Sequence, residues 1–196
     1  MPTLQEVLRY FNGATLMMAG KQEGLRRLDL SADGFWMSFS AILFSLPPIV
    51  LSWIEFEAAE RQHPLGDSGW GTVYAAHLLA DLLSWLLPVM VLMMIARPIG
   101  YSRKIVPLVI ATNWGGALLA WAVVPYWILV MLFGAGPTLT VVGVLITIAS
   151  LILTVRLTAV AIGGDVLAAI GVVALMVVCS LISYGAVMDV TGVPLL

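Results

Sequence analysis

The sequence predicts an all-α, polytopic transmembrane helix bundle with about five spans. Its 196 residues are 61% hydrophobic and only 10% charged. Soluble domains carry about 25% charged residues, so most of this surface cannot face water. The apolar runs are long and unbroken, whereas a transmembrane β-barrel would show alternating segments of about ten residues. A net charge of −2 and the lack of a basic stripe argue against a nucleic-acid-binding protein.

Residues 1–34 precede the spans and are expected to form a cytoplasmic segment. Four apolar residues at spacings of three and four predict a short amphipathic helix on the membrane surface, with a loosely ordered tail as the alternative. They are Leu4, Val7, Leu8 and Phe11. A basic cluster follows, of the kind that lies beside anionic lipid headgroups. It consists of Lys21, Arg26 and Arg27. Ser31 and Asp33 are expected to cap the next helix.

The bundle itself is expected to cover residues 35–196, and its first span is expected over 35–56. Pro47 and Pro48 fall near the middle of this span. Each proline removes a backbone donor, so a kink or break is expected there.

The second span, residues 73–96, carries a polar stripe. At about 1.5 Å per residue it reaches about 36 Å, enough to cross a hydrocarbon core of about 30 Å. The stripe consists of Tyr74, His77, Asp81, Ser84 and Pro88. Their spacing of three and four places them on one side of the helix. An ionisable group at the centre of a span costs at least about 2.5–3.5 kcal/mol, so the stripe should face protein or water.

His77 and Asp81 are four residues apart, so they are expected to touch. A carboxylate beside an imidazole favours the charged imidazole, which would suit a proton or ion relay. The structural alternative is a hydrogen-bonded pair that joins this helix to its neighbours, since such polar contacts are common between membrane helices.

The third apolar run, residues 105–133, is long for a single span, because a straight helix would reach about 43 Å. We expect one span to residue 124, after which Pro125 redirects a short interfacial piece; two half-spans are the alternative. Two small-residue pairs predict close helix packing. They are Ala111 with Gly115 and Gly116 with Ala120. Asn113, between them, is expected to donate to Asp81 or to the backbone freed by the prolines of the first span.

The fourth span is expected over 138–155, ended by Arg156, and the fifth over 166–187, capped by Asp165. Basic residues then orient the chain. Those on the side of the N-terminus are Arg9, Lys21, Arg26, Arg27, Arg97, Arg103, Lys104 and Arg156. Only Arg61 falls on the other side. The positive-inside rule therefore predicts a cytoplasmic N-terminus and an external C-terminus.

The segment LDLSADGFWMSFSAILFSLP, residues 28–47, is similar to the openings of bacterial inner-membrane proteins. A cytoplasmic N-terminus followed by five closely spaced spans resembles the Yip1-like family. The resemblance covers the chain through hydropathy and topology. It implies a non-enzymatic, multi-pass protein of the bacterial cytoplasmic membrane, and it assigns no functional residue.

Catalysis is not expected, because the sequence lacks the HExxH, GxSxG and P-loop motifs. A lipid-modifying enzyme is the least favoured class, and no cofactor is expected. Glu57, Glu60 and His63 have helical spacing and could hold a divalent cation, but a solvated loop is the favoured interpretation, so no metal is expected.

The leading hypothesis is a structural or interaction role, in which the bundle packs with other membrane subunits or with itself. The alternative is a small transporter or proton-coupled channel that uses His77, Asp81 and Asn113. A water-filled cavity that reaches Asp81 would favour transport, whereas a dry, packed stripe would favour the structural role.

Overall fold

The computed structural model describes residues 2–59, 69–98 and 100–195. These residues form α-helices and short 3-10 helices, and the described part contains no strand. The elements are α1 (Leu4–Met18), η1 (Gln22–Arg27), α2 (Ala32–Ser38), α3 (Ala41–Ala59), α4 (Trp70–Ala96), η2 (Ser102–Lys104), α5 (Ile105–Phe133), α6 (Pro137–Ala161) and α7 (Val166–Thr191). Five segments are long and apolar enough to cross a membrane: α2 with α3, and α4 to α7. The predicted all-α polytopic bundle is confirmed.

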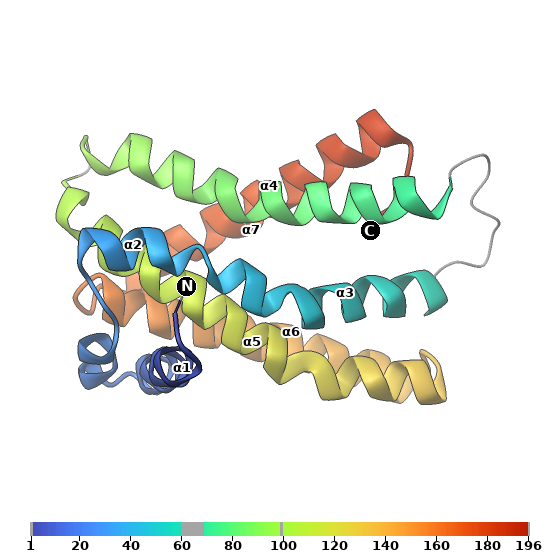
Figure 1. The fold of residues 1–196 in the computed structure, drawn as a ribbon, viewed down its shortest axis with the longest axis horizontal. Helices are drawn as coiled ribbons and strands as arrows, with labels where there is room; N and C mark the ends of the chain where they lie inside the picture. The colour runs from blue at the N-terminus through green and yellow to red at the C-terminus, as the bar shows by residue number, and fades with distance from the viewer. Residues whose placement is uncertain (1, 60–68, 99, 196) are drawn as a thin grey trace.

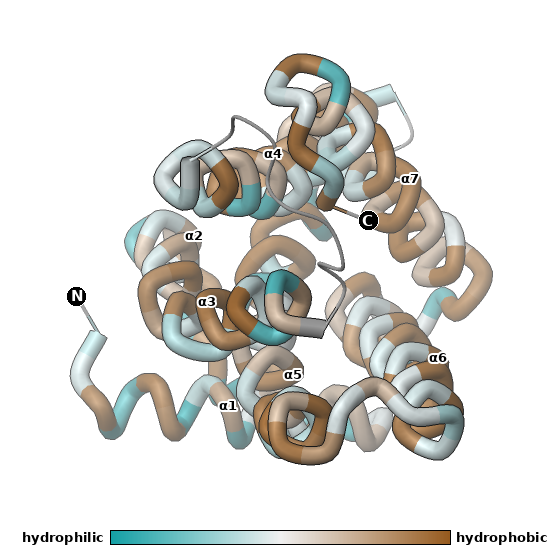
Figure 2. Tube along the Cα trace, turned by 90° about the vertical axis from the view of Figure 1, so that its right-hand side faces the viewer, coloured by the Kyte–Doolittle hydropathy of each residue, from teal (hydrophilic) through white to brown (hydrophobic). Residues whose placement is uncertain are grey.

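The long helices run along a common direction and form a ring (Figures 1 and 2). Helix α4 packs along α7, α7 along α6, α6 along α5, and α5 along α3. The ring closes between α3 and α4 mainly through long side chains rather than through close backbone approach. This loose junction is where the polar residues of the bundle gather.

One end of the bundle carries most of the basic residues. The N-terminal helices, the turn between α4 and α5, and the turn between α6 and α7 all lie at this end, on the left in Figure 1. Arg97, Arg103 and Lys104 belong to the α4–α5 turn. Lys21, Arg26 and Arg27 lie in or beside η1. The assignment of this end to the cytoplasm stays a prediction.

Helix α1 lies across the bundle instead of along it: it is seen end-on in Figure 1 and lengthwise in Figure 2. Thr3 and Glu6 form a capping box at its start. The expected helix is therefore present. The face packed on the protein is made by Val7, Tyr10, Ala14 and Met17. Leu4 and Leu8 stay exposed, which leaves them available for lipid.

The break in the first span lies at Phe39 and Ser40, not at the prolines. The hydroxyl of Ser38 donates to the Phe35 carbonyl at 2.7 Å, and that of Ser40 donates to the Met37 carbonyl at 2.6 Å. Such bonds compete with the helical pattern and favour its interruption. Helix α3 then runs through both prolines without ending. Of the kink or break expected at the prolines, the break was wrong.

Helix α5 is a single helix of 29 residues that contains Pro125. The alternative of two half-spans was therefore wrong, and the expected piece after residue 124 is a continuation of the same helix. A proline removes one helical hydrogen bond, whereas a helix end leaves several carbonyls without intrahelical partners. In hydrocarbon each unsatisfied group costs several kcal/mol, so continuing the helix is the less costly solution.

The last two spans extend beyond their expected ends. Helix α6 continues past Arg156 to Ala161, and the Arg156 guanidinium reaches the Ala19 carbonyl at 2.8 Å. A long arginine side chain can bring its charge to the interface in this way, so the helix need not end there. Asp165 accepts from the Ala168 N–H at 3.0 Å, which confirms it as the cap of α7. Ser31 likewise caps α2.

Candidate functional site

The polar residues of α4 meet α3 and α7 inside the ring. His77 is buried, with 3% of its surface exposed, and its Nε2 lies 2.9 Å from Oε1 of Glu57 on α3. Trp53 stacks on the imidazole, and Phe56 contacts it edge-on, both at 5.7 Å between ring centres. His77 therefore has a carboxylate partner on another helix, while the expected pairing with Asp81 stays a prediction.

Asp81 joins three helices. Its Oδ2 accepts a hydrogen bond from the indole N–H of Trp53 on α3 at 2.7 Å. Its Oδ1 accepts from the hydroxyl of Tyr184 on α7. Both donors are neutral, so they hold the carboxylate in place without cancelling its charge. From the sequence, Trp53 is expected only as an indole near a membrane interface, and Tyr184 has no expected role. The available signal for both is a polar-tipped aromatic residue within an apolar span.

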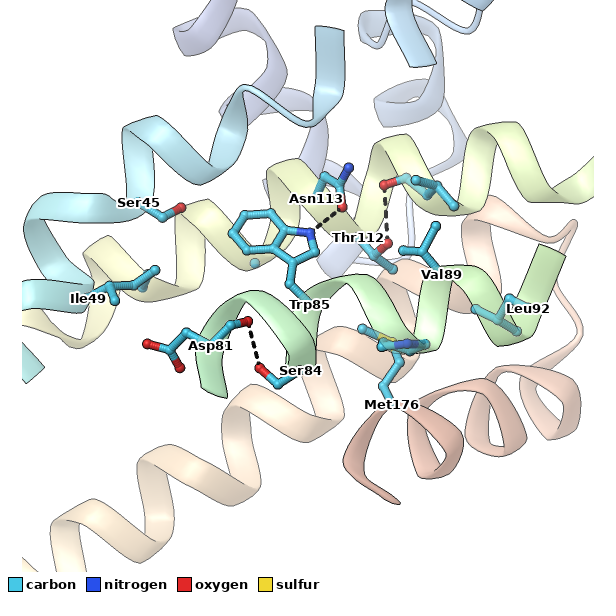
Figure 3. A pocket seen from close by; sticks show the side chains of 14 residues that line it. Ser45, Ile49, Asp81, Ser84, Trp85, Val89, Leu92, Thr112, Asn113 and Met176 are labelled. Atoms are coloured by element: carbon cyan, nitrogen blue, oxygen red, sulfur yellow. Dashed lines mark hydrogen bonds between the residues drawn. The ribbon is translucent and has the colours of Figure 1, made fainter. Parts of the chain in front are cut away.

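A cavity of about 270 Å³ lies between α3, α4, α5 and α7 and reaches Asp81. Its wall is mostly apolar. The polar members are Ser45, Asp81, Ser84, Trp85, Thr112 and Asn113. Figure 3 shows that these side chains come from α3, α4 and α5, and that Trp85 and Asn113 meet. The Ser84 hydroxyl donates to the Asp81 backbone carbonyl at 2.9 Å, within its own helix.

Asn113 fixes the position of Trp85. The indole N–H of Trp85 donates to Oδ1 of Asn113 at 2.7 Å, and Nδ2 of Asn113 donates to the Ser38 hydroxyl at 2.9 Å. Asn113 is 1% exposed, so these two hydrogen bonds satisfy both the oxygen and the nitrogen of a buried amide. The expected acceptors of Asn113 were wrong. The Phe44 carbonyl has no helical donor, because residue 48 is a proline. It accepts a hydrogen bond from the indole N–H of Trp121 instead, at 2.9 Å.

A second cavity, of about 380 Å³, is lined by residues of α3, α4 and α7. Trp53, His77 and Tyr184 line it, together with Ser52 and Ser180. The first cavity is lined by Asp81, and the second by both of its hydrogen-bond donors. The two hydrogen bonds of the carboxylate therefore lie where the two cavities approach each other.

Two residues of the polar stripe remain: Pro88, which lines the first cavity, and Tyr74, which contacts aromatic side chains. Tyr74 stacks on Trp70 at 6.2 Å and contacts Trp53 at 6.4 Å between ring centres. Glu60 and His63, from the metal alternative, lie outside the described residues. Among the described residues, no group of three His, Cys, Asp or Glu side chains could hold a metal ion.

The small residues of α5 divide into two sets. Ala111 is fully buried, and a Cβ added at Gly115 would lie 2.5 Å from Cδ1 of Leu157, so α5 and α6 approach closely there. Gly116 and Ala120 face the first cavity. Their small size leaves room for that cavity instead of for another helix.

Polar contacts at the basic end tie the turns together. The Tyr101 hydroxyl donates to Oδ2 of Asp165 at 3.0 Å, and the Lys104 ammonium lies 4.4 Å from the Tyr101 ring centre. The Ala168 backbone N–H, followed by the Tyr101 hydroxyl, lowers the pKa of Asp165. The same contact with Asp165 raises the pKa of Tyr101. The α4–α5 turn is thus attached to the start of α7.

Comparison with protein-family models, curated proteins and solved structures gives no match to this chain. The resemblance to the Yip1-like family therefore stays a prediction from hydropathy and topology. The site has to be interpreted from its own geometry.

Proposed function

We propose that this integral membrane protein is a small transporter or proton-coupled channel in which Asp81 binds the transported cation or proton. The observation that carries the proposal is the cavity that reaches Asp81 inside the bundle. A dry, packed stripe would have favoured a purely structural role. Intramembrane carboxylates are rare and costly, and they commonly mark ion or proton pathways.

The electrostatics of the site support a positively charged occupant. A carboxylate away from water needs a compensating charge or a proton. Asp81 receives only neutral donors from α3 and α7. His77, one turn earlier on α4, is paired with Glu57. A proton or a bound cation would supply the missing positive charge at Asp81.

Asp81 lines the first cavity and its two donors line the second, and this arrangement supports a path along the bundle. A proton or ion that leaves one cavity would meet the carboxylate before it enters the other. Opening such a path requires the contacts of Asp81 with Trp53 and Tyr184 to separate. The loose junction of α3 and α4 makes this region easier to open than the closely packed α4–α7 and α3–α5 interfaces.

A liposome experiment tests the proposal. Purified protein is reconstituted in vesicles that hold a pH-sensitive dye, and proton entry is driven by a potassium gradient with valinomycin. The wild type is expected to conduct protons, and Asp81→Asn is expected to abolish the current. Asp189→Asn, at an exposed carboxylate near the end of α7, is the matched control and should leave the rate unchanged. An unchanged rate in Asp81→Asn would refute the role of this carboxylate.

A structural or interaction role is the second candidate, favoured by an exposed face on α7. Gly171 and Gly185 lie 14 residues apart, close to four helical turns, and a Cβ at either would meet nothing within 4 Å. Val178, between them, is 51% exposed. Small residues on one face let a second membrane helix approach closely. Crosslinking and native purification test this role: Gly185→Leu should abolish an assembly that Gly185→Ala retains.

The proposed setting is the bacterial cytoplasmic membrane, with the basic end of the bundle in the cytoplasm. The bias of Lys and Arg toward that end supports this orientation. The five-span layout supports the Yip1-like resemblance, which is one of hydropathy and topology. Fusion of a periplasm-active and a cytoplasm-active reporter to each terminus tests it: an inactive periplasmic reporter at the C-terminus would contradict the orientation.

A further inference from the structure

The first cavity has a lining that selects for the chemistry of its ligand. Apolar side chains from four helices make up most of its wall, including Ile49, Val89, Leu92 and Met176 (Figure 3). A fully polar or strongly hydrated solute would lose its water shell there without replacement. The body of a ligand that fits this wall must therefore be largely apolar.

The charge of the lining has one sign. Asp81 is its single carboxylate, and none of the described lining residues is a lysine, arginine or histidine. Attraction between unit charges is much stronger in a low-dielectric site than in water. The cavity therefore favours a cation and disfavours an anion of the same size.

Trp85 adds a second element of cation recognition. Its N–H is occupied by Asn113, which fixes the ring within the cavity wall one turn from Asp81. The face of an indole is the strongest cation-binding surface among the aromatic side chains. Asp81 and Trp85, on successive turns of α4, thus both line this cavity, and a carboxylate and an indole face each attract an organic cation.

We propose that this cavity binds a small organic cation with an apolar body, in the class of amines and quaternary ammonium compounds. The proposal rests on the proposed function and names its substrate class. The volume of about 270 Å³ lies just below the range of about 300–1,000 Å³ typical of small-molecule pockets, which limits the ligand to about one ring with its ammonium group. Both oxygens of Asp81 already accept a hydrogen bond, so a quaternary ammonium group, which needs no directional acceptor, matches the site.

Equilibrium binding in lipid nanodiscs tests the proposal, with empty nanodiscs subtracted. The probes are benzyltrimethylammonium, its uncharged isostere neopentylbenzene, and benzenesulfonate as the anion. The cation is expected to bind at least about tenfold more tightly than the neutral isostere, and the anion is expected not to bind. Equal binding of the cation and the neutral isostere would overturn the proposal. This comparison uses the wild-type protein alone, so it does not depend on the folding of any variant.

Variants then assign the interaction to its residues. Asp81→Asn is expected to weaken the binding of benzyltrimethylammonium at least about tenfold, and Trp85→Leu several-fold, whereas Trp85→Phe retains most of it. Asp189→Asn should bind like the wild type. Circular dichroism and a monodisperse elution profile verify that each variant is folded. Cation binding that persists in folded Asp81→Asn would also overturn the proposal.

The liposome assay separates this inference from the proposed function. Proton conduction that depends on Asp81, without binding of benzyltrimethylammonium, would refute the substrate class and leave the proposed function standing. Specific binding of benzyltrimethylammonium without flux of protons or of this cation would refute the transport function and leave the binding site standing.

Discussion

Trp121 on α5 donates its indole N–H to the Phe44 carbonyl on α3, at 2.9 Å. In a regular helix that carbonyl would accept from the N–H of residue 48, four residues later. Residue 48 is a proline and has no N–H to give. The tryptophan of one helix therefore replaces the hydrogen bond that the proline removes from another. Trp121→Phe keeps an aromatic ring but leaves the carbonyl without this partner.

Two estimates bound the effect of that substitution. An acceptor left unsatisfied away from water costs about 1–3 kcal/mol. Hydrogen bonds between membrane helices contribute about 0.6 kcal/mol on average and at most about 1.7 kcal/mol. We therefore expect Trp121→Phe to lower the free energy of unfolding by about 1 kcal/mol, where the two ranges overlap.

A double-mutant cycle isolates the hydrogen bond from other effects of the substitution. Pro48→Ala restores an N–H four residues after Phe44, so the carbonyl regains a partner within α3. In this background Trp121→Phe should cost less than about 0.5 kcal/mol. Reversible unfolding in bicelles, followed by circular dichroism, measures all four proteins. The same loss in both backgrounds would refute the proposal that Trp121 compensates for Pro48.

Three further predictions concern stability. Glu57→Ala should cost about 1–3 kcal/mol in bicelle unfolding, because it removes the carboxylate that lies 2.9 Å from the buried His77 imidazole. The double substitution Glu57→Leu with His77→Phe should recover most of the loss. Gly24→Ala should cost about 1–3 kcal/mol, because its Cβ would collide with the α1 backbone, while Gly171→Ala, which has open space, should cost nothing. The pKa of Asp165 is below its ordinary value of 3.8, so its contribution to stability is present above pH 3.8 and is lost as the pH falls through the lowered pKa. Asp165→Asn, which still caps α7, should remove this part of the pH dependence of the melting temperature; an unchanged profile would contradict the assignment.

Composition and hydropathy were sufficient to predict the all-α membrane bundle and its five spans. The reason is that a bilayer imposes a fixed length and requires each span to satisfy its own backbone, so the apolar runs define the helices. Local signals also predicted helix starts, as at Ser31 and Asp165, because a cap depends on residues only three positions apart.

Local signals failed where a proline stood inside an apolar run. Pro47, Pro48 and Pro125 are all contained within helices. In water a proline often ends a helix, since the freed backbone groups can bond to solvent. In a membrane another helix can supply the partner, as Trp121 does for the Phe44 carbonyl, and the sequence around the proline does not specify that helix.

The sequence by itself determined that the polar side of the second span must turn inward, because ionisable groups are costly in lipid. Only the tertiary structure decided the partners: Glu57 for His77, and Trp53 and Tyr184 for Asp81. Helical periodicity specifies which residues share a face, but the order of helices around the ring specifies what that face meets. The partners of Asp81 lie 28 and 103 residues away along the chain, and only the packing of α3 and α7 against α4 brings them to one carboxylate.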